Sequence, residues 1–374
     1  MNFDLRQHTC LLTIAGSRLY GIHTDQSDVD IKGVAIPPAE YYLGQKKFEQ
    51  ADAIEHMQTF MQDLTEEEQG ISKKEKLEGT VYEIKKFISL ATDNNPNILD
   101  VLFADDSQVR LITPLGRALR TNRDIFLSKK AYFTHHGYAY SQLKRIKTHR
   151  RWLLNPVEIK PTRADFDLPE HSLIPNDALS ATFALINKKV DEWEVDLSCI
   201  PSEPDRIALL ERIKHTIEEI IAGDEKWKRA GRFIGIDEHM LVLVDRERKY
   251  NSAMSDWKSY QNWVKTRNPK RAAMEAEFGY DLKHAAQLVR LMRTCKELLQ
   301  TGKLNVNRAG IDAEEILAIK NGAWTYEQME ESFNKESAEI EMLYKTSTAL
   351  PKTPNFKKID DLCCRILSEH LKCA

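Results

Sequence analysis

The spacing of apolar residues changes along the chain, and the change predicts two kinds of structure. In the first third, apolar runs at 11–15 and 29–36 have the length and the β-branched composition of strands, with polar segments around them. Further on, apolar residues recur mainly at helical spacing, as at 282–299. We therefore expect an α/β (α+β) fold, with a sheet domain over residues 1–125 followed by a mainly helical domain over residues 126–374.

Helix breaks and one long polar segment subdivide this pattern. A helix is expected at 81–92, and Pro96 ends it because a residue that precedes proline disfavours the α conformation. Helical spacing also appears at 207–213 and 217–221. A polar loop with four prolines is expected near 155–175. A loop of this length can cap an active site, contact RNA or simply connect two elements at the surface. The sequence does not decide among these three roles.

Composition limits the possible partners and the compartment. The 374 residues carry a formal net charge of −3, so any contact with nucleic acid must come from a local basic patch. The six cysteines form neither a zinc-type pair of pairs nor a disulfide framework. The N-terminus lacks the apolar run of a signal peptide, and no segment is apolar for the roughly 20 residues that cross a bilayer. We expect a cytoplasmic protein with reduced thiols.

One local basic patch does occur, and two interpretations of it remain open. Five fixed positive charges fall within eight residues and are followed by a tryptophan on which a base could stack. The other interpretation is the exposed basic end of a helix. The residues are Lys144, Arg145, Lys147, Arg150, Arg151 and Trp152.

A Gly-Ser turn followed by an Asp-x-Asp pair carries the clearest chemistry. Asp28 and Asp30 stand at i and i+2 of an expected strand, so they share a face, with Cα atoms about 6.5 Å apart. With a third acid, such a pair can hold two divalent cations for phosphoryl transfer. Gly16 lets the backbone approach a phosphate closely, and Ser17 offers a hydroxyl and an amide. Either motif alone is common in ordinary turns and strands, but the two in this order favour nucleotidyl transfer.

In this order the two motifs closely resemble those of nucleotidyltransferases of the DNA polymerase β superfamily. Within it the chain looks like the branch called RNA-repair-pathway (RlaP-like) nucleotidyltransferases, which occurs in bacteria and large phages. The resemblance covers most of the chain and is least clear over 152–245. The other segments that are similar to this branch are 82–87, 95–102, 126–130, 137–139, 267–269, 278–285 and 288–291.

This resemblance implies a polymerase β-like sheet domain that depends on Mg²⁺ or Mn²⁺. Its metal ligands and catalytic residues would be Asp28, Asp30 and a third acid from a neighbouring strand. Glu78 stands where relatives usually have Asp. A glutamate can also ligate Mg²⁺, but Glu78 could equally be an exposed acid at a strand edge.

The resemblance also implies a nucleotide pocket that draws on both domains. The Gly-Ser turn would hold the β and γ phosphates, two nearby basic residues would neutralise charge, and the helix starting near residue 280 would supply a further pair. Each basic residue could instead be a solvated surface group. The residues expected to bind the nucleotide are Gly16, Ser17, Arg18, Lys32, Lys283 and His284.

The activity that follows is transfer of a nucleoside monophosphate from an NTP to an acceptor hydroxyl, with release of pyrophosphate. The family name implies an RNA 3′ end, such as that of a tRNA, as the acceptor. A protein side chain or a small molecule is the alternative, because the same fold modifies all three. A non-catalytic module that binds nucleotide or RNA is the alternative of another class. The sequence does not indicate the oligomeric state.

Overall fold

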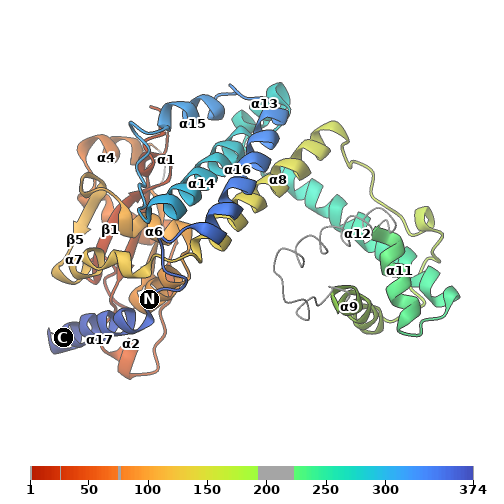
Figure 1. The fold of residues 1–374 in the computed structure, drawn as a ribbon, viewed down its shortest axis with the longest axis horizontal. Coiled ribbons are helices and arrows are strands. Elements are labelled where there is room, and N and C mark those ends of the chain that lie inside the picture. The colour runs from red at the N-terminus through yellow and green to blue at the C-terminus, as the bar shows by residue number, and fades with distance from the viewer. Residues whose placement is uncertain (1, 26, 75–76, 193–222, 374) are drawn as a thin grey trace. The chain divides into compact units, whose positions relative to one another are not determined.

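The computed structural model describes residues 2–25, 27–74, 77–192 and 223–373 (Figure 1). The helices expected at 207–213 and 217–221 lie outside these residues. None of the helices within them is both long enough and apolar enough to cross a membrane.

Contacts divide the chain into two compact units that differ from the division expected at residue 125. One unit joins Met1–Leu153 to Pro269–Ala374, and the other is Leu154–Asn268. The sheet therefore shares its unit with helices from the end of the chain. Apolar side chains of those helices enter the core under the sheet, which the local spacing of residues cannot reveal.

A five-stranded sheet lies at the centre of the first unit, with strand order β3-β4-β2-β1-β5. Strands β2 and β4 are parallel, and the other neighbouring pairs are antiparallel. The strands are β1 Thr9–Ala15, β2 Asp30–Ala35, β3 Gln50–Ala51, β4 Glu78–Glu83 and β5 Val109–Ile112.

The first unit otherwise consists mainly of helices. They are α1 Gly16–Leu19, α2 Glu40–Leu43, α3 Ile54–Met57, α4 Glu66–Ser72, α5 Ile84–Thr92, α6 Pro96–Phe103, α7 Pro114–Thr121, α8 Gly137–Leu154, α13 Pro269–Phe278, α14 Leu282–Thr301, α15 Ala313–Lys320, α16 Tyr326–Thr346 and α17 Phe356–Cys373. The break expected before Pro96 is confirmed, because α5 ends at Thr92 and Asn95 caps α6 through the amide of Asn97. In Figure 1, α14 and α16 lie along one another, and their residues touch over much of their length.

The sheet is covered on both faces, which explains why β1 is buried throughout. On one face, Leu11 and Val34 share a core with Phe87 of α5, Leu99 of α6 and Leu288 of α14. Helix α14 thus packs directly on the sheet domain although about 250 residues separate it from β2 in sequence.

The opposite face of the sheet has a smaller core. Leu12 and Ile31 point to this side and pack against Met57 and Phe60, which follow β3. Both neighbours of Asp30 in the chain are therefore fixed by packing on this face, and the side chain of Asp30 points to the opposite face, at the start of the central strand β2.

The second unit is helical and has its own core. Within the residues that the structure describes, its helices are α9 Asn176–Glu192, α11 Gly223–Phe233 and α12 Glu238–Thr266, and side chains of all three share one apolar cluster. The loop near 155–175 is attached to this unit, because Arg163 and Ser172 both donate hydrogen bonds to the buried Glu247 of α12.

Candidate active site

Three carboxylates meet where β2 and β4 begin. Asp30 is the first residue of β2 and lies beside Glu78, the first residue of β4, because the two parallel strands are in that register. Asp28 comes two residues ahead of β2. Val29 and Ile31 are buried, so alternation along the chain puts Asp28 and Asp30 on the same side. The three acids expected from the sequence are therefore brought together.

The Gly-Ser turn packs against the same carboxylates. Gly16 has a positive φ of 63°, and a Cβ at this position would collide with the Oδ2 atom of Asp30. Only glycine allows this approach, which explains its place directly after β1. Ser17 follows in the single turn of α1, so a phosphate held at this turn would lie next to the acidic cluster.

A polar pocket opens at this point, with a volume of about 590 Å³. This lies within the range of about 300–1,000 Å³ that is usual for small-molecule sites. Its walls come from the Gly-Ser turn, from β2 and β4, and from α6 and α14. The lining residues are Ala15, Gly16, Tyr20, Asp30, Ile31, Lys32, Asp52, Ile54, Glu78, Gly79, Thr80, Asn97 and Gln287.

The pocket concentrates negative charge at Asp30. Burial, together with the negative charges of Asp28 and Glu78, raises the pKa of this carboxyl to about 6, whereas the cations Lys283 and Lys32 act in the opposite direction. Clustered carboxylates at the edge of a polar pocket are the oxygen ligands that Mg²⁺ and Mn²⁺ prefer. The residues present therefore fit a divalent metal site, formed by Asp28, Asp30 and Glu78.

This charge cluster predicts a stability that depends on pH. Without divalent cations, Asp30→Asn should stabilise the fold by about 1–2 kcal/mol at pH 8, because it removes a half-buried anion that faces two others. The folded-state pKa of Asp30, about 6, exceeds its ordinary value of 3.8, so the wild type loses stability as the pH rises through this interval. The stability advantage of Asp30→Asn over the wild type should be complete above pH 6 and absent below about pH 4.

Urea unfolding of both proteins in EDTA at pH 8 and pH 4 measures this difference. Added Mg²⁺ should then stabilise the wild type more than the variant, because only the wild type has the full ligand set. A variant that is less stable than the wild type at pH 8 in EDTA would contradict the assignment of Asp30 to a repulsive cluster.

Lys32 lies in the pocket wall one pleat beyond Asp30. Burial lowers its pKa, whereas the carboxylates of Asp100 and Asp30 favour its charged form. Lys32 is thus a half-buried cation beside the acids.

Two further lysines reach the acids from the helices at the end of the chain. Lys283 at the start of α14 has a favourable electrostatic interaction with Asp30. Lys320, the last residue of α15, interacts favourably with Asp28 and unfavourably with Lys283. Burial is the largest cause of the lowered pKa of Lys320. Sequence reasoning missed Lys320 because nothing in its local pattern links it to Asp28, about 290 residues earlier.

Arg18 braces the acidic loop. Its guanidinium donates hydrogen bonds to the backbone carbonyls of Ser27 and Asp28, both at 3.3 Å, and lies 3.4 Å from Glu67. Arg18 therefore holds the backbone at Asp28 in position, and it is absent from the pocket lining.

A buried polar network supports the inner wall of the pocket. The Tyr20 hydroxyl donates a hydrogen bond of 2.7 Å to Asp100, and the guanidinium of Arg290 lies 3.6 Å from the centre of the Tyr20 ring. Arg290 is only 1% exposed, so its charge offsets that of Asp100 inside the protein. The network fixes Tyr20, a pocket residue, between α6 and α14.

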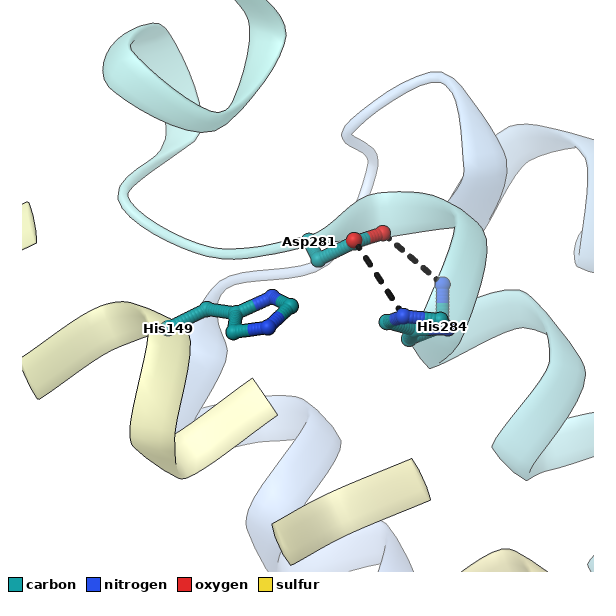
Figure 2. Close-up of side chains that lie close together, drawn as sticks. All are labelled: His149, Asp281 and His284. Carbon is teal, nitrogen blue, oxygen red and sulfur yellow. Dashed lines mark hydrogen bonds and ion pairs between the residues drawn. The ribbon is translucent and has the colours of Figure 1, made fainter. Parts of the chain in front are cut away.

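His284 faces a different set of residues from its neighbour Lys283. Figure 2 shows it beside Asp281 and His149, and its Nε2 lies 3.6 Å from a carboxylate oxygen of Asp281. Burial lowers the pKa of His284 to about 4, so it is neutral near pH 7. The structure thus separates Lys283 from His284, which were expected to act as a pair.

The basic patch on α8 is partly engaged in internal contacts. Arg150 donates to the carbonyl of Gly279 at 3.0 Å and stacks over the Tyr326 ring, and Lys147 pairs with Glu330. Lys144, Arg145, Lys147 and Arg151 have exposed or half-exposed side chains.

Trp152, at the end of this patch, is only 6% exposed, and its ring stacks on His149. The exposed indole face that a stacking platform needs is therefore missing at this position.

Other acids near the turn are accounted for by ion pairs. Asp63 binds Arg6 with two hydrogen bonds, and the buried Glu68 binds Arg110 in the same way. Asp52, which the sequence pattern did not single out, lines the pocket instead. It is the alternative to Glu78 as a third acid.

Comparison with known proteins agrees with this geometry. Residues 6–160 match the model of a family described as the RNA repair pathway DNA polymerase beta family. An uncharacterised 38.9 kDa protein from the nrdC–mobD intergenic region of Enterobacteria phage T4 is 25% identical over 365 residues, which cover 94% of this chain and 93% of that protein. No solved structure matches the chain significantly. The matched segment contains the Gly-Ser turn, all three acids and the whole sheet. Over residues 6–160 this chain is therefore similar to the RNA repair pathway DNA polymerase beta family.

Proposed function

We propose that this protein transfers a nucleoside monophosphate from an NTP to an acceptor hydroxyl and releases pyrophosphate. The observation that carries the proposal is the cluster of Asp28, Asp30 and Glu78 directly beside the Gly16-Ser17 turn, in which Asp30 and Glu78 line one pocket. A family in the polymerase β superfamily supports a nucleotidyltransferase of this kind.

The acids have a defined task in this reaction. Asp28, Asp30 and Glu78 would hold Mg²⁺ or Mn²⁺, which supplies charge stabilisation and a lowered pKa for an oxygen nucleophile. The acceptor oxygen forms a bond to the α-phosphorus, the bond from that phosphorus to the bridging oxygen breaks, and the electron pair leaves with pyrophosphate. The proton of the acceptor hydroxyl passes to solvent or to a carboxylate of the site.

The basic residues would bind the negative charge that builds up on the leaving group. Lys32 borders the pocket, and Lys283 and Lys320 interact electrostatically with its acids from α14 and α15. An anion between these two lysines would also relieve their mutual repulsion, which is one cause of the lowered pKa of Lys320. The amides and hydroxyl of the Gly-Ser turn would bind the β and γ phosphates from the other side.

An RNA 3′ end is our proposed acceptor. The family name supports it, and so does the exposed basic surface of α8 formed by Lys144, Arg145 and Lys147. These charges stand out in a chain whose formal net charge is −3.

Incubation with each α-labelled NTP, Mg²⁺ and either total RNA or total protein tests the activity and the acceptor together. We expect label that becomes soluble after ribonuclease treatment and resists protease. Label in protein alone would overturn the RNA acceptor and leave the transferase activity standing. No incorporation and no pyrophosphate release with any NTP would contradict the transferase itself.

A variant of the α8 surface tests RNA binding separately. Replacing Lys144, Arg145 and Lys147 by Ala should weaken RNA binding. The slope of log affinity against log salt concentration should also become less negative, by roughly 0.7 for each phosphate that the variant no longer binds, because fewer counterions are released. Fluorescence anisotropy with a labelled single strand, from low to moderate salt, gives both quantities.

The matched control removes the same charge elsewhere. Lys352, Lys357 and Lys358 are exposed, and their replacement by Ala should leave the affinity and the salt dependence nearly unchanged. Equal effects of the two triple variants would mean that the α8 surface does not bind RNA specifically.

A further inference from the structure

Two helices bring a second set of potential metal ligands together, apart from Asp28, Asp30 and Glu78. His149 lies on α8, whereas Asp281 caps α14 and His284 lies in its first turn. One ligand atom from each of the three residues lies within 4.8 Å of the other two (Figure 2). Two imidazoles and a carboxylate thus face a common point between two helices.

The side chains of Asp281 and His149 are held in place by their surroundings. A carboxylate oxygen of Asp281 accepts a hydrogen bond of 3.0 Å from the backbone amide of His284, and Asp281 is only 1% exposed. The ring of His149 stacks on Trp152 at 5.7 Å, with an angle of 21° between the rings. The cluster therefore differs from the exposed groups of acids that are common on protein surfaces.

We propose that His149, Asp281 and His284 bind a zinc ion that links α8 to the start of α14. Two imidazole nitrogens and one carboxylate oxygen are ligands that Zn²⁺ accepts, and three protein ligands leave a fourth position for water. In a tetrahedral site at a Zn–ligand distance of about 2.1 Å, the ligand atoms stand about 3.4 Å apart. To reach this separation from at most 4.8 Å, the ligand atoms must approach one another by little more than about 1 Å, which small side-chain rotations allow.

Arg271 competes with the ion for Asp281. Its guanidinium lies 3.4 Å from both carboxylate oxygens, and its side chain is 37% exposed. This distance exceeds the roughly 2.7–2.9 Å of a strong charge-assisted hydrogen bond, so the contact is weak. Because the side chain is partly exposed, the guanidinium of Arg271 can rotate toward solvent when an ion binds Asp281. Arg145 adds a second positive charge near His284. Both charges should reduce the zinc affinity without removing the site.

A zinc ion at this position would also affect Lys283. Asp281 and His284 flank Lys283, so a bound ion would fix the turn from which Lys283 extends toward Asp30. The zinc site itself does not depend on the transferase proposal, since its binding can be measured without activity.

Zinc binding is best measured where the acids of the pocket cannot bind metal. The full chain with Asp28→Asn and Asp30→Asn, freed of metal with EDTA and dialysed, serves as the background. We expect it to bind one Co²⁺ with the visible absorption of a four-coordinate ion, and stoichiometric Zn²⁺ to displace that ion.

Two variants in that background test the ligands, and a third serves as the control. Loss of an outer-shell partner costs about 10–100-fold in metal affinity, so His284→Gln and Asp281→Asn should each lower the Zn²⁺ affinity at least about a hundredfold. Asn can still cap α14, so the second variant tests the charge without removing the cap. The control His239→Gln changes an exposed histidine of the other unit and should leave the affinity unchanged.

Arg271→Gln tests the shared carboxylate, and the zinc affinity should rise severalfold because a competing cation is removed. Unchanged binding in His284→Gln, no four-coordinate Co²⁺ in the background protein, or no rise in Arg271→Gln would each overturn the proposal. Circular dichroism of every variant shows whether a loss reflects the ligand or the fold.

Discussion

Replacing both Asp28 and Asp30 by Asn should reduce nucleotidyl transfer by at least about a thousandfold, which corresponds to about 4 kcal/mol of lost transition-state stabilisation. Asn keeps the shape of Asp but removes the charges that would bind Mg²⁺ or Mn²⁺. The fold should persist, because burial and two neighbouring acids raise the pKa of Asp30, so removal of its charge should not destabilise the folded protein. Pyrophosphate release with saturating NTP is the measurement.

A matched double variant separates this effect from a general loss of negative charge. Asp360 and Asp361 are exposed on α17, and their replacement by Asn makes the same change in net charge away from the pocket. That variant should retain full activity. Near wild-type pyrophosphate release in the Asp28 and Asp30 variant, with an unchanged circular dichroism spectrum, would refute the metal site.

The part of the site that follows from local geometry could be predicted from the sequence. Alternation along an extended chain fixes which side chains share a side, so the spacing of Asp28 and Asp30 was enough to put them together, although β2 begins only at Asp30. The Gly-Ser turn after an apolar run likewise identified Gly16, whose positive φ and contact with Asp30 require glycine. Register between strands is less local, and Glu78 was indicated only by resemblance to relatives.

The features that the sequence did not predict depend on packing between elements that are far apart in the chain. Lys320 and Asp52 reach the pocket through the arrangement of whole elements, which no periodicity encodes. Arg290 follows Lys283 at helical spacing, but it is buried because Asp100 and Tyr20 supply a charge partner and a ring inside the protein. The same packing joins α14 to the sheet and produces a division into units that differs from the expected boundary at residue 125.

Glu78→Gln should lower the rate of transfer at least about a hundredfold, the second large effect that the site predicts. Gln keeps the volume of the side chain and the pairing of β4, whereas it removes the negative charge beside Asp30. Glu78→Asp should restore part of the activity, because the shorter acid keeps the charge. A merely structural role for Glu78 at the strand end would not distinguish these two variants.

Asp52→Asn is the matched control for Glu78, since Asp52 lines the same pocket and the change removes the same charge. If Glu78 is the third metal ligand, Asp52→Asn should retain more than half of the wild-type rate in the same pyrophosphate assay. Glu78→Gln with more than a tenth of wild-type activity, together with a severe loss in Asp52→Asn, would transfer the role to Asp52. Asp63 and Glu68 are poorer replacements, because each is already bound by an arginine through two hydrogen bonds. A loss confined to Glu78→Gln, with recovery in Glu78→Asp, is the outcome expected if β4 supplies the third acid.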